Sequence, residues 1–360
     1  VSNKTKNVHS LNVMGQEFQR KQGRFAGLTL LHIAIFKQIR FRKGAKCSQN
    51  TGFADLYFIK LEFSALIFGL LAHKWLQKSE NIFDVKTINK NFDIVLLYEN
   101  ANTGDTCVPE TFTNIEKLEL PVISKVGDPQ RAKEFSPEKY HEKYKINAYF
   151  GLTHEDIFYK YYPKKFKYKV VIYGLEPTLF QTVSPFNSRK SAKILNSGAV
   201  ASLKLRNRLF CKLTKGDSDP MIHYKLRTLC NKLPYVDYTS PLEHEYRGDK
   251  YTQLLQKYRA SIAATTTYPT MKYLEIPASG CLTFMEITKN NRGSYLGFED
   301  EKNAIFINEK NYQEKFESYL SDVDNPKWEE IANSGREYVM NNLTNDHAVN
   351  SLVELMEEFV

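Results

Sequence analysis

The sequence predicts an α/β protein made of two Rossmann-like domains that face each other across a ligand cleft. Three observations lead to this prediction. Short apolar runs typical of buried parallel strands alternate with helical segments along most of the chain. The alternation stops at QTVSPFNSRKS, residues 181–191, and then starts again. At 360 residues the chain is long enough for two domains, each with its own core.

The first half is expected to contain a parallel sheet. Residues 24–44 space their apolar side chains by about 3.6 residues and end in a basic stretch, which predicts a helix. Residues 57–72 predict a buried amphipathic helix. The expected strands are FDIVLLY (92–98), LPVISKV (120–126), INAYFGL (146–152) and YKVVIYG (168–174). Residues 1–180 then form the N-terminal domain.

The second half repeats the pattern over residues 181–345, which we expect to be the second domain. Its expected strands are AKILNSGAV (192–200), ASIAATTT (260–267), GCLTFME (280–286) and NAIFINE (303–309). Helices are expected at 202–215, from about residue 271, and at 311–321, 326–340 and 346–359. We expect the segment 346–360 to pack back toward the N-terminal domain.

Charge is distributed unevenly along the chain. The net charge is +9, and residues 1–80 carry thirteen Lys or Arg against four Asp or Glu. Residues 271–360 carry eight basic against seventeen acidic side chains. A basic N-terminal segment suits an anionic ligand, a nucleic acid or an acidic membrane surface, and charge alone does not choose among these partners.

The five cysteines are scattered and contain no CxxC pair, which predicts a reducing compartment and neither a disulfide framework nor a zinc site. The apolar stretch at 57–72 is interrupted by charges and is short for a membrane span. The N-terminus lacks the layout of a signal peptide. We therefore expect a cytoplasmic protein, with peripheral contact to a membrane left open.

A small-residue turn at Ser197 and Gly198 follows the expected strand 192–200 and precedes a basic helix. Backbone amides of such a turn, with Lys204 and Arg206 close behind it, suit a diphosphate. The chain has neither a GxxxxGK[ST] loop nor a GxGxxG fingerprint. The alternative is that residues 202–215 are a solvated basic face.

The stretch KYLEIPASGCLTF, residues 272–284, places a carboxylate near the start of a helix. Thr270 is expected to cap this helix, which begins near Met271. Its free amides would point toward the cleft, Lys272 could meet a phosphate, and Glu275 could accept hydrogen bonds from ribose hydroxyls. The alternative is that Glu275 only complements the helix dipole.

The chain resembles glycosyltransferases of the GT-B fold, close to the family-1 and family-4 group that includes the CgeB-like spore-maturation proteins. The resemblance covers residues 170–355 well, 90–170 loosely and the first 80 not at all. It rests on five motifs in the expected order: VVIYGLEPTLFQ (170–181), SGAVASLKLR (197–206), YRGDKYTQLLQKYRASIA (246–263), KYLEIPASG followed by LGFEDEKNAIFI, and SGREYVMNNLTNDHAV (334–349).

This resemblance implies a donor site for a nucleoside-diphosphate sugar in the C-terminal domain and an acceptor site in the N-terminal domain. Glu275 matches the second glutamate of the family's Glu-seven residues-Glu signature, which binds ribose hydroxyls. Arg206 and Lys204 match residues that neutralise the diphosphate, so no metal and no further cofactor is implied. Residues 270–272 match the loop that faces the phosphates or the sugar. Thr267 stands where the first glutamate is expected, which leaves the donor sugar and the stereochemical course open.

The acceptor side offers two candidate catalytic residues at predicted strand ends. His154, in LTHEDIFYK, could act as a general base on the acceptor if the enzyme inverts. Asp128, in KVGDP, is a second candidate for the same role. The alternatives are a helix-starting role for His154 and a turn before Pro129 for Asp128.

The predicted function is transfer of a sugar from the nucleotide donor to a glycan, lipid-linked or other acceptor, as in polysaccharide biosynthesis. The alternative is a non-catalytic protein that keeps the fold and binds a nucleotide sugar or polyanion. The lysine-aromatic stretch YKYYPKKFKYK (159–169) suits an anionic membrane, a polyanion or single-stranded nucleic acid, or else covers the core with its aromatics. No sequence-specific nucleic-acid partner is predicted.

Overall fold

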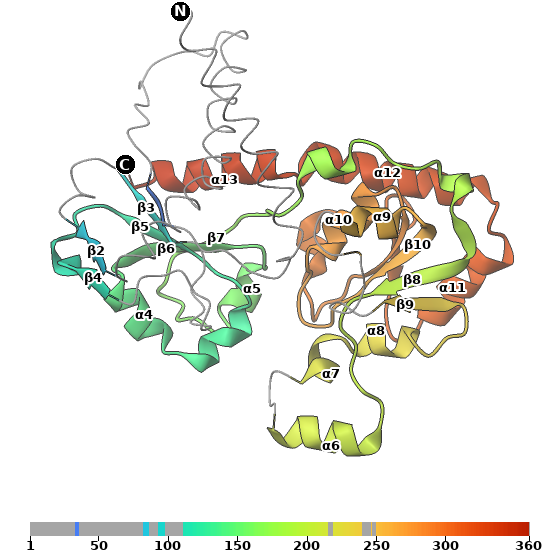
Figure 1. The fold of residues 1–360 in the computed structure, drawn as a ribbon, viewed down its shortest axis with the longest axis horizontal. Helices are drawn as coiled ribbons and strands as arrows, with labels where there is room; N and C mark the ends of the chain where they lie inside the picture. The colour runs from blue at the N-terminus through green and yellow to red at the C-terminus, as the bar shows by residue number, and fades with distance from the viewer. Residues whose placement is uncertain are drawn as a thin grey trace, which may run out of the picture. The chain divides into compact units, whose positions relative to one another are not determined.

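A computed structural model (Figure 1) describes residues 33–35, 82–85, 93–97, 111–214, 219–239, 246 and 250–359. The chain divides into a unit of residues 1–30 and a unit of residues 31–360, and all described residues belong to the second. The predicted helix at 57–72 lies outside the described residues.

The first sheet has the strand order β1-β3-β5-β6-β7. β3, β5, β6 and β7 run parallel, and β1 joins β3 antiparallel at the edge. β3 and β5 are buried along their whole length, as near-continuous apolar runs are when both faces of a parallel sheet are covered. The strands are β1 (Ile33–Ile35), β3 (Val95–Leu97), β5 (Val122–Lys125), β6 (Ile146–Gly151) and β7 (Tyr168–Val170).

One prediction in this half is wrong. Residues Ile33–Ile35 lie inside the expected helix 24–44 but form strand β1. The run LTLLHIAIF is apolar enough to fit both the helical repeat of about 3.6 residues and the strand repeat of two. Pairing with β3 selects the extended form. The rest of that predicted helix is outside the described residues.

Short helices and a two-stranded sheet complete the first half and the connection to the second. Most of these helices have a proline or a polar cap at their start; Ser136, for example, accepts from the Lys139 amide at the start of α4. The elements are β2 (Ile82–Asp84) paired with β4 (Thr111–Thr113), the 3-10 helices η1 (Ile115–Lys117), η2 (Pro129–Glu134), η3 (Pro177–Phe180) and η4 (Phe186–Ser188), and the α-helices α4 (Pro137–Lys143) and α5 (Glu155–Phe158).

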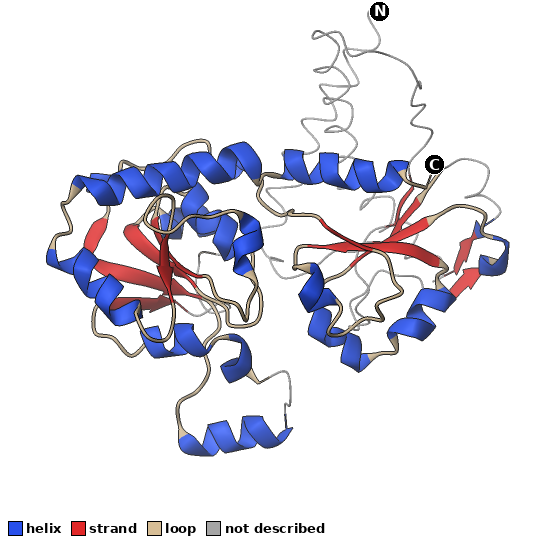
Figure 2. Ribbon diagram, turned by 180° about the vertical axis from the view of Figure 1, so that it is seen from behind, coloured by secondary structure: helices blue, strands red, loops and turns tan. Residues whose placement is uncertain are grey.

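The second sheet is parallel throughout, with the order β12-β11-β10-β8-β9. It is the central layer of the second half, and helices pack along it (Figure 2). Four of its strands were predicted and β9 was not, because VDYT is short and only half-buried. The strands are β8 (Lys190–Ser197), β9 (Val236–Thr239), β10 (Tyr258–Ala263), β11 (Leu282–Glu286) and β12 (Ile305–Ile307).

Two core clusters cover the two faces of this sheet. α9, α10 and the end of α12 contribute to one cluster, which includes Leu255, Ile276 and Val339. α8, α11 and the start of α12 contribute to the other, around Phe284 and Phe316. The helices are α6 (Leu205–Thr214), α7 (Pro220–His223), α8 (Lys225–Cys230), α9 (Tyr251–Leu255), α10 (Lys272–Ala278), η7 (Gly293–Leu296), α11 (Tyr312–Ser321) and α12 (Pro326–Asn342).

The last helix, α13 (Asn345–Glu357), shares a core with the first sheet. Leu352, Leu355 and Met356 lie in one buried cluster with Leu96 of β3 and Ile123 of β5. At the surface, Lys167 and Lys169 pair with Glu358 and Glu354. The two sheets, parallel except for β1, and their helices confirm the predicted α/β class. None of the described helices has the length and apolar character needed to cross a membrane.

Candidate functional site

Polar side chains gather at the carboxyl edge of the second sheet. β8 ends at Ser197, β11 ends at Glu286, and the three threonines 265–267 follow β10 closely. Because parallel strands end on the same side of a sheet, these groups converge on one edge, where ligands bind in open α/β folds.

Gly198 forms a tight turn at this edge, with a φ of +114°. A Cβ atom at this position would lie 2.7 Å from Nη1 of Arg227 and 2.9 Å from Cε of Lys272. The backbone conformation therefore favours glycine, and a side chain here would also displace the ends of both cationic side chains. The missing side chain allows two cationic side chains to approach the turn.

Arg227, on α8, is the more deeply buried of the two cations, with 2% of its surface exposed. Its Nη2 donates to the Ala264 carbonyl (2.8 Å) and its Nη1 to the Ala199 carbonyl (3.3 Å). Its buried Nε has no hydrogen-bond partner among the described residues. These two carbonyls fix the guanidinium between the ends of β8 and β10, beside the Gly198 turn.

Lys272 and Glu275 lie in the first turn of α10. The Lys272 ammonium is 2.9 Å from the Tyr251 hydroxyl. Burial, and then the positive charge of Arg227, lower the pKa of Lys272, whereas Glu275 opposes the shift. Burial raises the pKa of Glu275, and Lys272 opposes it. An anion bound here would favour the charged form of Lys272.

The start of α10 differs from the expected capping arrangement. Thr270 does not cap the helix; the cap position is Met271, and no side chain accepts a capping hydrogen bond. The Met271 side chain instead lies against Gly174, where a Cβ would come within 1.8 Å of its terminal methyl. The Thr270 carbonyl accepts from the Tyr273 amide, so Thr270 contributes its backbone to the turn.

Thr267, the position of the missing acidic residue, contacts a histidine. The Thr267 hydroxyl lies 3.0 Å from Nδ1 of His223, and the Thr266 amide donates to the His223 carbonyl (2.8 Å). His223 ends α7 and is 8% exposed. The buried Thr266 hydroxyl has no hydrogen-bond partner among the described residues. An imidazole thus stands beside the position where the resemblance expects a carboxylate.

Glu286 ends β11 with a buried carboxylate that is 3% exposed. Its Oε2 lacks a hydrogen-bond partner within the described part of the chain. Burial, and next the charge of Glu309, raise the pKa of Glu286 to about 7. The sequence analysis did not single out Glu286, although its place at the end of an apolar strand was a usable signal.

Asp128 is connected to the carboxyl edge of the second sheet by a hydrogen bond with Tyr268. It stands at the start of η2, is exposed, and its Oδ1 accepts from the Tyr268 hydroxyl (2.9 Å). Tyr268 directly follows Thr267, and burial, reinforced by the charge of Asp128, raises its pKa. The Asp128 carboxylate is therefore tied to the turn that carries Thr267.

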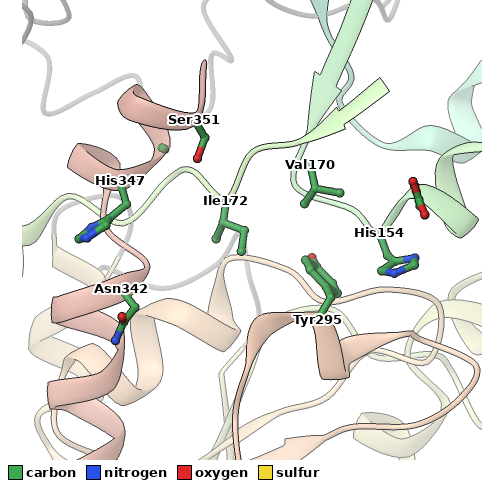
Figure 3. A pocket seen from close by; sticks show the side chains of 9 residues that line it. His154, Val170, Ile172, Tyr295, Asn342, His347 and Ser351 are labelled. Carbon is green, nitrogen blue, oxygen red and sulfur yellow. The ribbon is translucent and has the colours of Figure 1, made fainter. Parts of the chain in front are cut away.

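His154 lies elsewhere, at a separate cavity. It precedes α5, and its Nδ1 accepts from the Asp156 amide (3.1 Å). In the neutral ring the proton is then on Nε2, which makes that atom a donor rather than a base. The cavity of about 350 Å³ (Figure 3) is lined by His154, Glu155, Val170, Ile172, Tyr295, Asn342, His347, Ala348 and Ser351.

Lys204 and Arg206 are exposed, at and just before the start of α6. The cations that the structure brings to Gly198 are Arg227 and Lys272. Among the predicted residues, the structure thus collects Ser197, Gly198, Lys272, Glu275 and Asp128 around the edge of the second sheet, whereas His154, Lys204 and Arg206 face other surroundings.

Comparisons with known proteins identify the second half. Residues 206–354 match the family model described as "Glycosyl transferase-like". The second half is therefore similar to glycosyltransferases, and the chain has the fold of GT-B enzymes. HepE of Anabaena, solved in complex with UDP and glucose, is similar in fold at 15% identity over 76% of this chain and 80% of that one, with a TM-score of 0.50. Among curated proteins, none matches.

Two further solved structures are similar to this chain at lower scores. A glycosyltransferase from Rickettsia africae is 11% identical over 88% of this chain and 84% of that chain, with a TM-score of 0.47. Sucrose-phosphate synthase from Thermosynechococcus elongatus is 10% identical over 68% and 69%, with a TM-score of 0.43.

The lysine-aromatic stretch 159–169 divides its residues between core and surface. Tyr162 and Phe166 are buried in the first core, and Lys164 and Lys165 are exposed. Its aromatic side chains thus cover the core, which was one of the two interpretations of this stretch. Within the described ranges, no three His, Cys, Asp or Glu side chains are grouped to hold a metal.

Proposed function

We propose that this chain is a glycosyltransferase that takes its sugar from a nucleoside-diphosphate donor bound at the carboxyl edge of the second sheet. The observation that carries the proposal is the Gly198 turn, where the absence of a side chain leaves room beside Arg227 and Lys272. Two cations beside backbone amides are suited to a diphosphate. The fold similarity to HepE, which was solved with UDP and glucose, supports a donor of this class.

In this proposal each residue of the edge has a separate role. The donor's bond between the anomeric carbon and the β-phosphate oxygen breaks, and negative charge develops on the leaving diphosphate. Lys272 and Arg227 stabilise this charge in a site largely withdrawn from water. Glu275, one helical turn from the cap of α10, accepts hydrogen bonds from the ribose hydroxyls.

The acceptor hydroxyl forms the new bond to the anomeric carbon. Asp128 is the better candidate base, because its exposed carboxylate is tied to the turn that contains Thr267. In an inverting reaction it would take the proton that the acceptor hydroxyl loses. The acceptor is a glycan, a lipid-linked sugar or another hydroxyl compound, and a metal-independent, cytoplasmic enzyme remains our prediction.

The test compares the two cation assignments. The resemblance points to Arg206 for the diphosphate, and the geometry points to Lys272. We expect Lys272→Gln to weaken UDP binding, measured by calorimetry, by about tenfold or more, because a charge-assisted contact is worth roughly 1.5–3 kcal/mol. Arg206→Gln is the matched control, since it removes one exposed positive charge outside the edge.

The affinity for uridine separates diphosphate binding from general damage. Lys272→Gln should leave uridine affinity unchanged, whereas Glu275→Gln should weaken both ligands because it removes the ribose contact. Should Arg206→Gln weaken UDP binding and Lys272→Gln not, the diphosphate site lies on α6 and the proposed arrangement is wrong. UDP, GDP and ADP should all be tried, since the geometry does not select a base.

Turnover separates catalysis from binding alone. With UDP-sugar or GDP-sugar donors we expect release of the nucleoside diphosphate, by slow hydrolysis or by transfer to an acceptor. Asp128→Asn should lower the rate of release without changing donor affinity. Nucleotide binding without any release by the unmodified chain would instead support the non-catalytic alternative.

A further inference from the structure

Helix α6 carries the largest group of exposed apolar side chains in the described part of the chain. Leu205 is 76% exposed, Leu209 54%, Phe210 61% and Leu213 81%. Figure 1 shows α6 standing apart from the second sheet, beyond α7 and α8, and Figure 2 shows the same from behind. An apolar patch of this kind, carried on a separate helix, marks an interaction surface.

The apolar side chains of α6 follow the helical repeat. Leu205, Leu209 and Leu213 are spaced four residues apart and lie on one face, with Phe210 next to them. Lys204, Arg208 and Lys212 repeat with the same spacing one position earlier, and so form a basic row along the edge of that face. The helix is therefore amphipathic, with an apolar face bordered by positive charge.

The charge of this segment has a single sign. Residues 202–213 contain four basic side chains and no acidic one. The basic residues between Lys204 and Lys212 are all exposed. A protein partner fits this helix less well than a membrane, because lysine is depleted at protein–protein interfaces. A row of cations beside an apolar face instead matches a layer of lipid phosphates above acyl chains.

We propose that α6 binds this glycosyltransferase to an anionic membrane surface. Leu205, Leu209 and Leu213 enter the boundary between headgroups and acyl chains, and the basic row contacts lipid phosphates. The proposal uses none of the residues assigned above to the donor edge, so it can fail while the donor site holds. It would place the enzyme next to acceptors that are themselves attached to lipid.

Sedimentation of the full chain with lipid vesicles tests the proposal. We expect binding to vesicles that contain phosphatidylglycerol, little binding to pure phosphatidylcholine, and a steep loss of binding at high salt. The double variant Arg208→Gln/Lys212→Gln should bind about thirtyfold more weakly, because each cation near such a surface contributes about 1 kcal/mol. Lys164→Gln/Lys165→Gln removes the same charge from the exposed stretch 159–169 and should bind like the unmodified chain.

A second pair of variants tests the apolar contact. Leu213→Ser should weaken binding about tenfold, because it removes one leucine side chain from the boundary region. Leu179→Ser changes another exposed leucine, 39% exposed, and is expected to have no effect. Circular dichroism checks that all four variants are folded.

Three results would overturn the proposal. The first is no binding of the unmodified chain to anionic vesicles at physiological ionic strength. The second is a loss of binding in Lys164→Gln/Lys165→Gln but not in the α6 variants, which would assign the membrane contact to residues 159–169. The third is unchanged vesicle binding with weakened UDP binding in Arg208→Gln/Lys212→Gln, which would make α6 a cover of the donor site.

Discussion

At the scale of single residues, the carboxyl edge of the second sheet concentrates charge where little water reaches it. Arg227 and Lys272 approach each other beside Gly198, and Glu275 and Glu286 have raised pKa values because of burial. Buried charges of this kind cost folding free energy unless a partner compensates them. A bound diphosphate would supply compensating negative charge to the two cations.

The folding free energy lost by burying the Glu286 carboxylate can be measured from the pH dependence of stability. The folded-state pKa of Glu286 is about 7, above its ordinary value of 4.5, so the folded chain holds the proton more tightly than the unfolded chain. The free energy of unfolding should therefore fall as pH rises from about 4.5 to about 7. We expect Glu286→Gln to remove this dependence and to stabilise the protein at pH 8 by up to about 3 kcal/mol.

Urea denaturation at pH 5 and pH 8 provides the measurement. Glu314→Gln, at an exposed position of α11, is the control and should change stability by less than about 0.5 kcal/mol at either pH. If Glu286→Gln is less stable than the unmodified chain at pH 8, Glu286 has a partner that stabilises its charged form.

At the scale of elements, helix α12 shows how closely the parts of the second half approach one another. Gly335 lies in the middle of this helix, and a Cβ there would be 2.4 Å from the Asn303 carbonyl oxygen. Helical glycine normally costs about 1 kcal/mol relative to alanine. Here glycine is needed because the loop before β12 crosses the helix at backbone distance.

This contact reverses the usual effect of a glycine-to-alanine change. We expect Gly335→Ala to lower the free energy of unfolding by about 1–3 kcal/mol, because the Asn303 backbone must move. Asn333→Ala, at an exposed position of the same helix, should be neutral or slightly stabilising. Thermal denaturation of both variants gives the comparison, and a Gly335→Ala protein as stable as Asn333→Ala would show that the loop moves freely.

At the scale of the whole molecule, the C-terminal helix α13 connects distant parts of the sequence. Its buried face shares a core with β3, β5 and β6, more than 170 residues earlier in the chain. Glu354 on its exposed face pairs with Lys169, and Glu358 just after its end pairs with Lys167. Apolar burial should supply most of the stabilisation, because exposed ion pairs contribute at most about 1 kcal/mol.

A pair of substitutions in α13 separates these contributions. Leu355→Ala should lower the free energy of unfolding by about 2–5 kcal/mol, because it leaves a cavity at a fully buried position. Glu354→Gln breaks only the exposed pair with Lys169 and should cost less than about 1 kcal/mol. Similar losses in both variants would mean that this one ion pair stabilises the helix as much as the buried leucine does.

The sequence by itself determined the strands of both sheets except β1 and β9, because their apolar runs carry a local signal, and five ordered motifs gave the resemblance to glycosyltransferases that the family model matches over residues 206–354. It also singled out Gly198, Lys272 and Glu275 as candidate site residues, since each belongs to such a motif. Only the tertiary structure decided that Arg227 approaches Gly198, that His223 contacts Thr267 and that residues 33–35 form a strand. These outcomes depend on contacts between residues far apart in the chain, about which local periodicity carries no information.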